Sequence, residues 1–174
     1  MSGQGLPNLF SYFIGKQAGS LIFGGYNTIY QKFPEDQPVW LPIKEHYYWT
    51  LNLIDVRKET ASPVDRKLRK SEKKDNILMC PQGCNGVLDT GTFLIYGPRY
   101  VVEEYFTSLS NECKHKAALP NIVFMFSQGD SLLEVVLTPE DYVIEFEMNG
   151  QVECVIGITA DDSDDWTFGQ VFLR

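Results

Sequence analysis

The residues with the clearest chemical potential form one short motif, Asp89-Thr90-Gly91 followed by Thr92. Two apolar residues lead directly into it, which predicts a buried strand running into a tight turn. Gly91 would let the backbone take a conformation that other residues resist. The carboxylate of Asp89 would then stand at a strand end, where the hydroxyls of Thr90 and Thr92 can orient it. A carboxylate held in this way can act as a general base toward water.

The same motif also fits an ordinary turn between two strands, because Asp and Gly are common turn residues. Other catalytic patterns are absent from the sequence, which contains no Gly-rich phosphate loop, no H-E-x-x-H and no G-x-S-x-G. The two histidines, His46 and His115, lie in polar or aromatic surroundings, and we expect both on the surface. Asp89 is therefore the main candidate for a catalytic residue.

The elements that must position Asp89 are mostly strands. Residues 47–54 alternate in character and place Trp49, Leu51 and Leu53 on one face. Further short apolar runs are punctuated by Gly, Pro, Asn and Asp. These runs are residues 20–23, 39–43, 86–88, 93–95, 122–126, 132–137, 142–146, 154–158 and 171–173. The pattern predicts an all-β fold, either a β-barrel or a β-sandwich.

Two short helices are expected within this β-rich pattern. Pro98 suits a first helical turn, and the apolar residues 102, 105, 106 and 109 follow with helical spacing. A second helix is expected to begin near Thr138-Pro139, where a capping residue precedes proline and two acids. We expect both helices to have structural roles.

Charge distinguishes one segment from the rest of the chain. The sequence has 15 Lys and Arg against 23 Asp and Glu, a net charge of −8, and a pI near 4.7. This balance argues against nucleic acid as a partner, since phosphate binding needs a basic face. Eight of the basic residues nevertheless lie within residues 57–74. We expect residues 57–76 to be a charged insertion loop, with proteolytic processing and partner docking left open as its roles.

The four cysteines, Cys80, Cys84, Cys113 and Cys154, allow three disulfide pairings. Because His115 lies close to Cys113, zinc binding is an alternative. Structural zinc sites usually repeat a closely spaced cysteine pair, whereas here one C-x3-C pair precedes two cysteines that are 41 positions apart. The spacing favours two disulfides and an oxidising compartment.

Length and composition limit the class of protein. The chain has 174 residues, of which 44% are hydrophobic, enough for one domain with a sizeable core. No run approaches the roughly 20 apolar residues of a membrane-spanning helix. Residues 1–7 lack the basic start and apolar stretch of a signal peptide.

The order of these motifs resembles the C-terminal lobe of the pepsin-like aspartic proteases, peptidase family A1. The matching segments, in family order, are Leu9-Phe10-Ser11, residues 19–25, Trp40-x-Pro42, Tyr48-Trp49-x-Leu51, Cys80-x3-Cys84, residues 87–92, Gly97-Pro98, Cys113, residues 119–124, Leu137-x-Pro139-x-x-Tyr142, Cys154 and residues 166–174. The resemblance covers residues 6–174 outside the insertion. It implies one all-β lobe, a β-barrel or sandwich with one or two short helices.

The resemblance implies an aspartic endopeptidase as the parent protein. Two aspartates, one from each lobe, would share a proton and activate a water molecule that attacks the peptide carbonyl. Asp89 would be the second of these aspartates. Thr90 would bond across to the other lobe, Thr92 would support the outer carboxylate oxygen, and Phe168 and Gly169 would pair with the Asp89 loop.

Further implications of the resemblance concern the surroundings of the site. Val87 and Phe93 would contact substrate, although many family members have Ser at the position of Phe93. Gln170 stands where pepsin has Asp. No cofactor and no metal are implied. The implied disulfides are Cys80–Cys84 and Cys113–Cys154.

The implied partners are the N-terminal lobe that carries the other catalytic Asp, peptide or protein substrates, and pepstatin-type inhibitors. The implied location is the secretory pathway, an endolysosomal or vacuolar compartment, or the extracellular space, all of which suit disulfides.

The sequence also departs from the pattern of a whole family member. It holds one Asp-Thr-Gly motif, whereas the motif and the flap Tyr of the first lobe are missing, and the family continues with two strands beyond Arg174. We therefore expect the isolated chain to have no peptidase activity, because one carboxylate cannot serve as both acid and base. Two alternatives stay open: a catalytically dead relative that binds peptides or inhibits another protease, and an unrelated all-β binding module.

Overall fold

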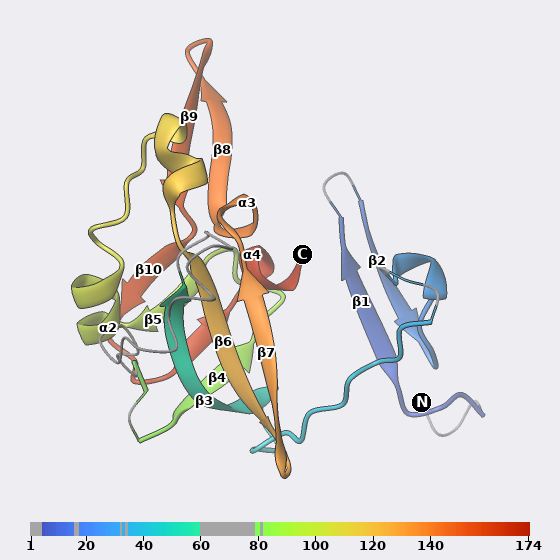
Figure 1. Cartoon of the computed structure of the whole chain (residues 1–174). Helices are drawn as coiled ribbons and strands as arrows, with labels where there is room; N and C mark the ends of the chain where they lie inside the picture. Colours follow the sequence, from blue (N-terminus) through green and yellow to red (C-terminus); the bar gives the residue numbers. More distant parts are fainter. Residues whose placement is uncertain (1–4, 16–17, 32, 34, 60–78, 81) are drawn as a thin grey trace. The chain divides into compact units, whose positions relative to one another are not determined.

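A computed structural model describes residues 5–15, 18–31, 33, 35–59, 79–80 and 82–174. The chain falls into two compact units, residues 1–40 together with Arg174, and residues 41–173, and each is described by itself. Strands are the main elements of the described chain (Figure 1), which confirms the predicted all-β class.

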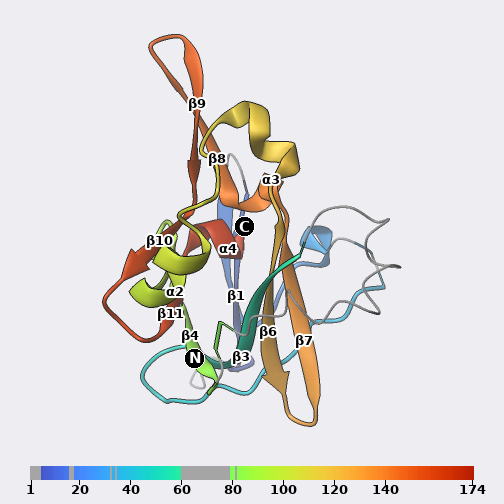
Figure 2. The same cartoon turned by 60° about the vertical axis from the view of Figure 1, so that its left-hand side comes forward.

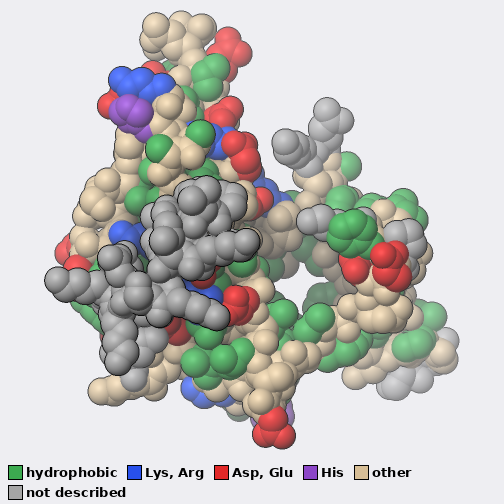
Figure 3. Space-filling model, in the orientation of Figure 1, with side chains coloured by type: hydrophobic (Ala, Val, Ile, Leu, Met, Phe, Trp, Pro, Cys, Tyr) green, Lys and Arg blue, Asp and Glu red, His purple; other side chains and the backbone are tan. Residues whose placement is uncertain are grey.

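The first unit is built on one hairpin. Strands β1 (Phe10–Ile14) and β2 (Gly19–Phe23) pair antiparallel, and a 3-10 helix, η2 (Thr28–Tyr30), follows. The rings of Phe13 and Tyr30 stack with their centroids 3.9 Å apart. Many large apolar side chains stay exposed, and Figure 3 shows green side chains over the visible face of this unit.

In the second unit, seven described strands form a sheet in the order β10-β5-β11-β4-β3-β6-β7. Their bounds are β3 (Thr50–Glu59), β4 (Cys84–Leu88), β5 (Ile95–Pro98), β6 (Asn121–Gln128), β7 (Ser131–Leu137), β10 (Ile158–Asp161) and β11 (Trp166–Phe168). Strand β11 lies between β4 and β5, parallel to β4 and antiparallel to β5. Phe168 therefore lies beside Leu88, the last residue of β4, and Asp89 follows at that end of the sheet.

A hairpin of β8 (Val143–Met148) and β9 (Gln151–Ile156) completes the strands of the described chain. It projects past the ends of β6 and β7 in both views (Figures 1 and 2). Its turn is Asn149-Gly150, with φ of 53° and 76°. Positive φ at both central residues matches the right-handed twist of the strands, which explains why this dipeptide predicts a hairpin.

The two expected helices are present. Helix α2 (Arg99–Tyr105) is preceded by Pro98, which occupies the N-cap position and not the first turn. Helix α3 (Pro139–Tyr142) begins after Thr138, whose backbone N–H and hydroxyl both donate to the Asp141 carboxylate at 2.7 Å. A short 3-10 helix, η3 (Cys113–Ala118), was not predicted.

Four strand predictions were wrong. Of residues 93–95, only Ile95 lies in a strand, as the first residue of β5. Residues 171–173 belong to a helix, α4 (Gln170–Leu173), because a run of only three apolar residues fits either structure. Residues 39–43 contribute only an isolated bridge, Ile43 to Leu51. The strand expected from residue 47 begins at Thr50, where pairing with β4 starts, and Trp49 is 52% exposed instead of facing the core.

The predicted insertion, residues 57–76, overlaps a strand. Arg57, Lys58 and Glu59 continue β3 and pair with residues of β6. Residues 60–76 lie outside the described residues. Arg57 also bonds Glu134 of β7 at 2.9 Å, so charged side chains at this end of β3 have partners on the sheet.

An aromatic cluster forms much of the core beneath β11. The ring of Phe124 lies 5.0 Å from that of Phe168 and 5.5 Å from that of Trp166, nearly perpendicular to both. Phe172 of α4 lies 4.3 Å from Phe168. Edge-to-face packing of buried rings stabilises such a cluster beyond its apolar area. Phe168 adjoins the Asp89 turn, so the packing of this core also holds the turn in place.

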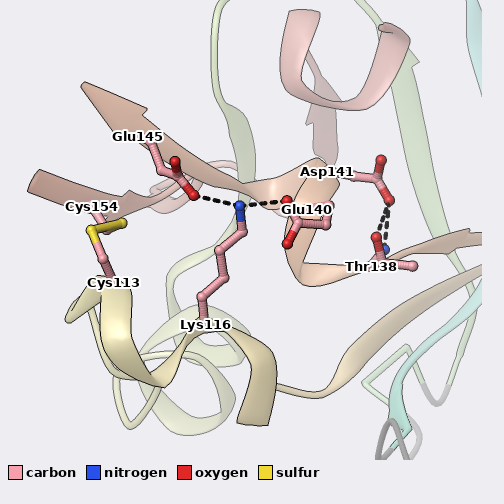
Figure 4. A network of polar contacts seen from close by, with 7 residues as sticks. All are labelled: Cys113, Lys116, Thr138, Glu140, Asp141, Glu145 and Cys154. Carbon is pink, nitrogen blue, oxygen red and sulfur yellow. Dashed lines mark hydrogen bonds and ion pairs between the residues drawn. A yellow bond between two sulfur atoms is a disulfide. The ribbon is translucent and has the colours of Figure 1, made fainter. Parts of the chain in front are cut away.

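Two contacts tie the β8–β9 hairpin to η3 (Figure 4). The ammonium of Lys116 lies 2.6 Å from the carboxylates of both Glu140 in α3 and Glu145 in β8. The disulfide Cys113–Cys154 joins η3 to β9. Among the described residues, no helix is long and apolar enough to cross a membrane.

Candidate active site

Asp89 directly follows β4 and is held by the backbone of β11. Its N–H donates to the carbonyl of Phe168 at 3.0 Å, and its own carbonyl accepts from the N–H of Thr92 at 3.3 Å. The first bond continues the ladder in which Phe168 lies opposite Leu88. The turn at residues 89–92 is thus stabilised by one internal hydrogen bond, and a second hydrogen bond attaches it to Phe168 of the core.

The carboxylate of Asp89 accepts two hydrogen bonds from the same turn. The hydroxyl of Thr92 donates to Oδ2 at 2.5 Å, and the backbone N–H of Gly91 donates to Oδ1 at 2.9 Å. These donors favour the ionised form and lower the pKa of Asp89, the Thr92 hydroxyl having the larger effect. The side chain is partly exposed, so the oriented carboxylate is accessible from the solvent.

Position 169 requires glycine, because neighbouring backbone atoms leave no room for a Cβ. A Cβ added there would lie 2.3 Å from the carbonyl oxygen of Leu94 and 2.5 Å from that of Thr92. Its N–H donates to Leu94 at 3.2 Å, and the following N–H of Gln170 donates to Thr92 at 2.8 Å. The start of α4 therefore packs directly against residues 92–94.

Gly91 is needed for a different reason from the one expected. Among the described residues, the glycines with positive φ are Gly5, Gly24, Gly83, Gly129 and Gly150, so Gly91 needs no left-handed conformation. A Cβ at this position would instead lie 3.2 Å from Oδ1 of Asp89. The glycine lets its backbone N–H approach the carboxylate closely.

Five of the eight expected site residues lie together in the structure: Asp89, Gly91, Thr92, Phe168 and Gly169. The other three expected residues lie around this group. Thr90 is exposed, and no described residue bonds its hydroxyl. Val87 lies in β4 opposite Thr50 and Thr167, and the side chain of Phe93 is 50% exposed.

Two contacts of the site were not expected. The side-chain Nε2 of Gln170 donates to the carbonyl of Thr90 at 3.3 Å, although the sequence indicated Gln170 only as a difference from pepsin. The N–H of Leu88 donates to the carbonyl of Trp49 at 3.0 Å. Neither contact has a sequence signal, because each joins residues that only the sheet order brings together.

Both implied disulfides, Cys80–Cys84 and Cys113–Cys154, are present. The four sulfurs are therefore not available as zinc thiolates. His115 is exposed, with Nδ1 lying 3.2 Å from Oγ of Ser110. His46 is also exposed, as expected. Within the described ranges, no group of three His, Cys, Asp or Glu side chains is placed to hold a metal ion.

An open cleft of about 430 Å³ lies elsewhere on the second unit. Its lining includes Lys44, Asn85, Tyr100, Asp164 and Asp165. It adjoins the Cys80–Cys84 disulfide at the start of β4, whereas Asp89 follows the end of that strand. Asp89 does not line this cleft.

Comparisons with known proteins indicate the family of the chain. A family model described as eukaryotic aspartyl protease matches residues 6–174. The chain is 34% identical over 185 residues to plasmepsin VII of Plasmodium berghei (strain Anka), covering 96% of this chain and 38% of the relative. It is 31% identical over 196 residues to plasmepsin VII of Plasmodium falciparum (isolate NF54), covering 100% of this chain and 43% of the relative.

A more distant relative is embryonic pepsinogen of Gallus gallus, 25% identical over 179 residues, covering 96% of this chain and 40% of the relative. The chain thus spans about two fifths of the length of these curated relatives. The family match covers nearly the whole chain, including the Asp89 turn and both disulfides. The chain belongs to the eukaryotic aspartyl protease family.

Proposed function

We propose that this chain is the C-terminal catalytic lobe of an aspartic endopeptidase and that Asp89 is one of its two catalytic aspartates. The observation that carries the proposal is the Asp89 carboxylate, which Thr92 and Gly91 orient and which is partly exposed at a strand end. Membership of the aspartyl protease family supplies the reaction class. The length comparison, in which the chain spans about two fifths of its relatives, supports a partner lobe.

The chemistry requires a second carboxyl group opposite Asp89. Two carboxyl groups that share one proton divide the work, since they do not both ionise easily. The ionised one accepts a proton from water as the water oxygen attacks the peptide carbonyl, and the protonated one donates to the carbonyl oxygen. The lowered pKa of Asp89 favours its ionised form. In the described chain, its carboxylate accepts hydrogen bonds from Gly91 and Thr92, and the proposal assigns the second carboxyl to the N-terminal lobe.

The remaining residues of the site have supporting roles in this proposal. The exposed hydroxyl of Thr90 bonds the other lobe, and Phe168 and Gly169 hold the Asp89 turn. Val87 and the half-exposed Phe93 contact a peptide or protein substrate. A pepstatin-type inhibitor binds at the same site as the substrate, beside Asp89. No cofactor takes part.

The proposal also covers the cellular location of the protein and the dependence of its activity on a second lobe. Two disulfides suit an oxidising compartment, whether secretory, endolysosomal, vacuolar or extracellular. The isolated chain is inactive, because one carboxylate cannot be base and acid at once.

The first test is the coding sequence upstream of residue 6 in the parent protein. The proposal expects a second Asp-Thr/Ser-Gly preceded by two apolar residues, about one lobe before Asp89, and a Tyr-bearing hairpin after it. An upstream frame without that motif would favour a catalytically dead, peptide-binding relative. The second test is cleavage of a fluorogenic peptide by the purified 174-residue chain between pH 3 and 7. Cleavage that a pepstatin-type inhibitor abolishes would refute the need for a second lobe.

A further inference from the structure

The peptide group between Thr90 and Gly91 is held on both of its sides. Its N–H donates to Oδ1 of Asp89 at 2.9 Å, and its C=O accepts from Nε2 of Gln170 at 3.3 Å. A peptide group is planar, so fixing the direction of the carbonyl also fixes the direction of the N–H. The Gln170 side chain and the Asp89 carboxylate are therefore connected through one rigid unit.

From this connection, we propose that Gln170 is a positioning residue that orients the Asp89 carboxylate through the Thr90–Gly91 peptide. The side chain can perform this role because its own backbone is fixed. The N–H of Gln170 donates to the carbonyl of Thr92 at 2.8 Å, and the adjacent Gly169 packs against Leu94 and Thr92. The side-chain amide of Gln170 thus extends from the fixed first residue of α4 to the carbonyl of Thr90.

The role also depends on the chemistry of the amide. Thr90 C=O can only accept a hydrogen bond, and a Gln amide nitrogen donates one, whereas an ionised carboxylate only accepts. Donation to the carbonyl polarises the peptide group, which strengthens the bond from Gly91 N–H to Asp89. Gln170 thereby stabilises the oriented carboxylate without touching it.

Substitutions at position 170 can separate the effect of side-chain length from the effect of the hydrogen bond. Gln170→Met keeps the length and removes the donor, Gln170→Glu keeps the shape and replaces the donor with an acceptor, and Gln170→Asn keeps the donor but is too short to reach. None of them removes the backbone bond to Thr92. Leu173→Ala is a matched control, because it truncates another α4 side chain, an apolar one that cannot hydrogen-bond the turn.

The primary measurement is amide hydrogen exchange of Gly91 by NMR in the 174-residue chain. Gln170→Met, Gln170→Glu and Gln170→Asn are each expected to speed this exchange about fivefold, the effect of one neutral hydrogen bond, whereas Leu173→Ala leaves it unchanged. Exchange in Gln170→Met equal to that of the wild type would overturn the inference. If the variants fail to fold, a nuclear Overhauser contact between the Gln170 side-chain amide and the Hα protons of Gly91, which lie on the carbonyl side of the peptide group, decides in the wild type. Its absence would contradict the proposal.

The functional consequence rests on the proposed protease activity and is measured in the full-length parent. Gln170→Met is expected to lower kcat about fivefold with KM unchanged, because the substitution disturbs the carboxylate and not the substrate contacts. A change in KM alone would contradict a positioning role. The exchange experiment needs no activity, so an inactive parent would count against the proposed function and leave the role of Gln170 intact.

Discussion

The hydroxyl of Thr92 donates a hydrogen bond to the carboxylate of Asp89, three residues earlier, with 2.5 Å between the two oxygens. This bond has the largest effect in lowering the pKa of Asp89. We predict that Thr92→Val raises the pKa of Asp89 toward its ordinary value and that Thr92→Ser keeps it low. A 13C NMR titration of the Asp89 carboxyl group measures both. An unchanged midpoint in Thr92→Val would show that the hydroxyl does not stabilise the ionised form.

The same bond predicts a pH dependence of stability. Because the folded pKa of Asp89 lies below its unfolded value, near 3.8, ionised Asp89 stabilises the fold above that pH. The stabilisation is lost as the pH falls through the folded pKa. We therefore expect Thr92→Val to reduce the free energy of unfolding at pH 6 and to have a smaller effect at pH 2. Urea unfolding at both pH values checks this, and equal effects would contradict it.

Gly169→Ala is predicted to destabilise the second unit. A methyl group there would lie 2.3 Å from the Leu94 carbonyl oxygen, so the backbone must shift, with a loss of about 1–3 kcal/mol. Gly25→Ala is the control, because an added Cβ meets nothing within 4 Å and φ is not positive. We expect it to change stability by less than about 1 kcal/mol. Equal effects of the two substitutions in urea unfolding would show that the close packing at Gly169 is not required.

The two disulfides are predicted to contribute unequally. Cys113–Cys154 spans 41 positions and Cys80–Cys84 spans 4. Loop-closure entropy then gives about 4 kcal/mol for the first and about 2 kcal/mol for the second. Replacing each pair by Ser and comparing urea unfolding measures the difference. A larger loss from Cys80→Ser with Cys84→Ser would contradict the entropic order.

Lys116 is predicted to stabilise the attachment of the β8–β9 hairpin. Its side chain is 13% exposed and contacts Glu140 and Glu145 at 2.6 Å, so Lys116→Met would leave two like charges close together. We expect a loss of about 1 kcal/mol that shrinks in 1 M salt. Lys114→Met is the control, because Lys114 is 70% exposed and, among the described residues, pairs with a single carboxylate, that of Glu112.

The Lys116 contacts also have a predicted pH window. Both carboxylates raise the pKa of Lys116 above its ordinary 10.5. The contribution is therefore full below pH 10.5 and is lost as the pH rises through the folded pKa. The difference in unfolding free energy between wild type and Lys116→Met should accordingly be the same at pH 8 and pH 9. A difference that disappears between those values would contradict the ion-pair explanation.

Local patterns predicted much of the fold. The Asn149-Gly150 turn, the Thr138-Pro139 helix start and the strand that leads into Asp89 each depend on neighbouring residues, and each is present. Residues 171–173 were wrongly predicted as a strand, because their short apolar run carries no periodicity. Trp49 was wrongly placed on the core face, because the start of β3 depends on its pairing with β4.

The site could be predicted in part for the same reason. Asp89, Gly91 and Thr92 belong to one motif and interact within one turn. The contact of Gln170 with Thr90 joins residues 80 positions apart, and no spacing rule brings them together. It follows from β11 lying between β4 and β5, which is a property of the whole sheet.

The central claim, that Asp89 is a catalytic aspartate, is tested most directly by peptidase assay of the full-length parent carrying Asp89→Asn. This substitution keeps the shape of the side chain and removes its ability to accept a proton from water. The account predicts that kcat falls at least about 100-fold, while Asp164→Asn, an exposed residue of the separate cleft, leaves kcat unchanged. A parent enzyme that keeps its full kcat with Asn at position 89 would contradict the account.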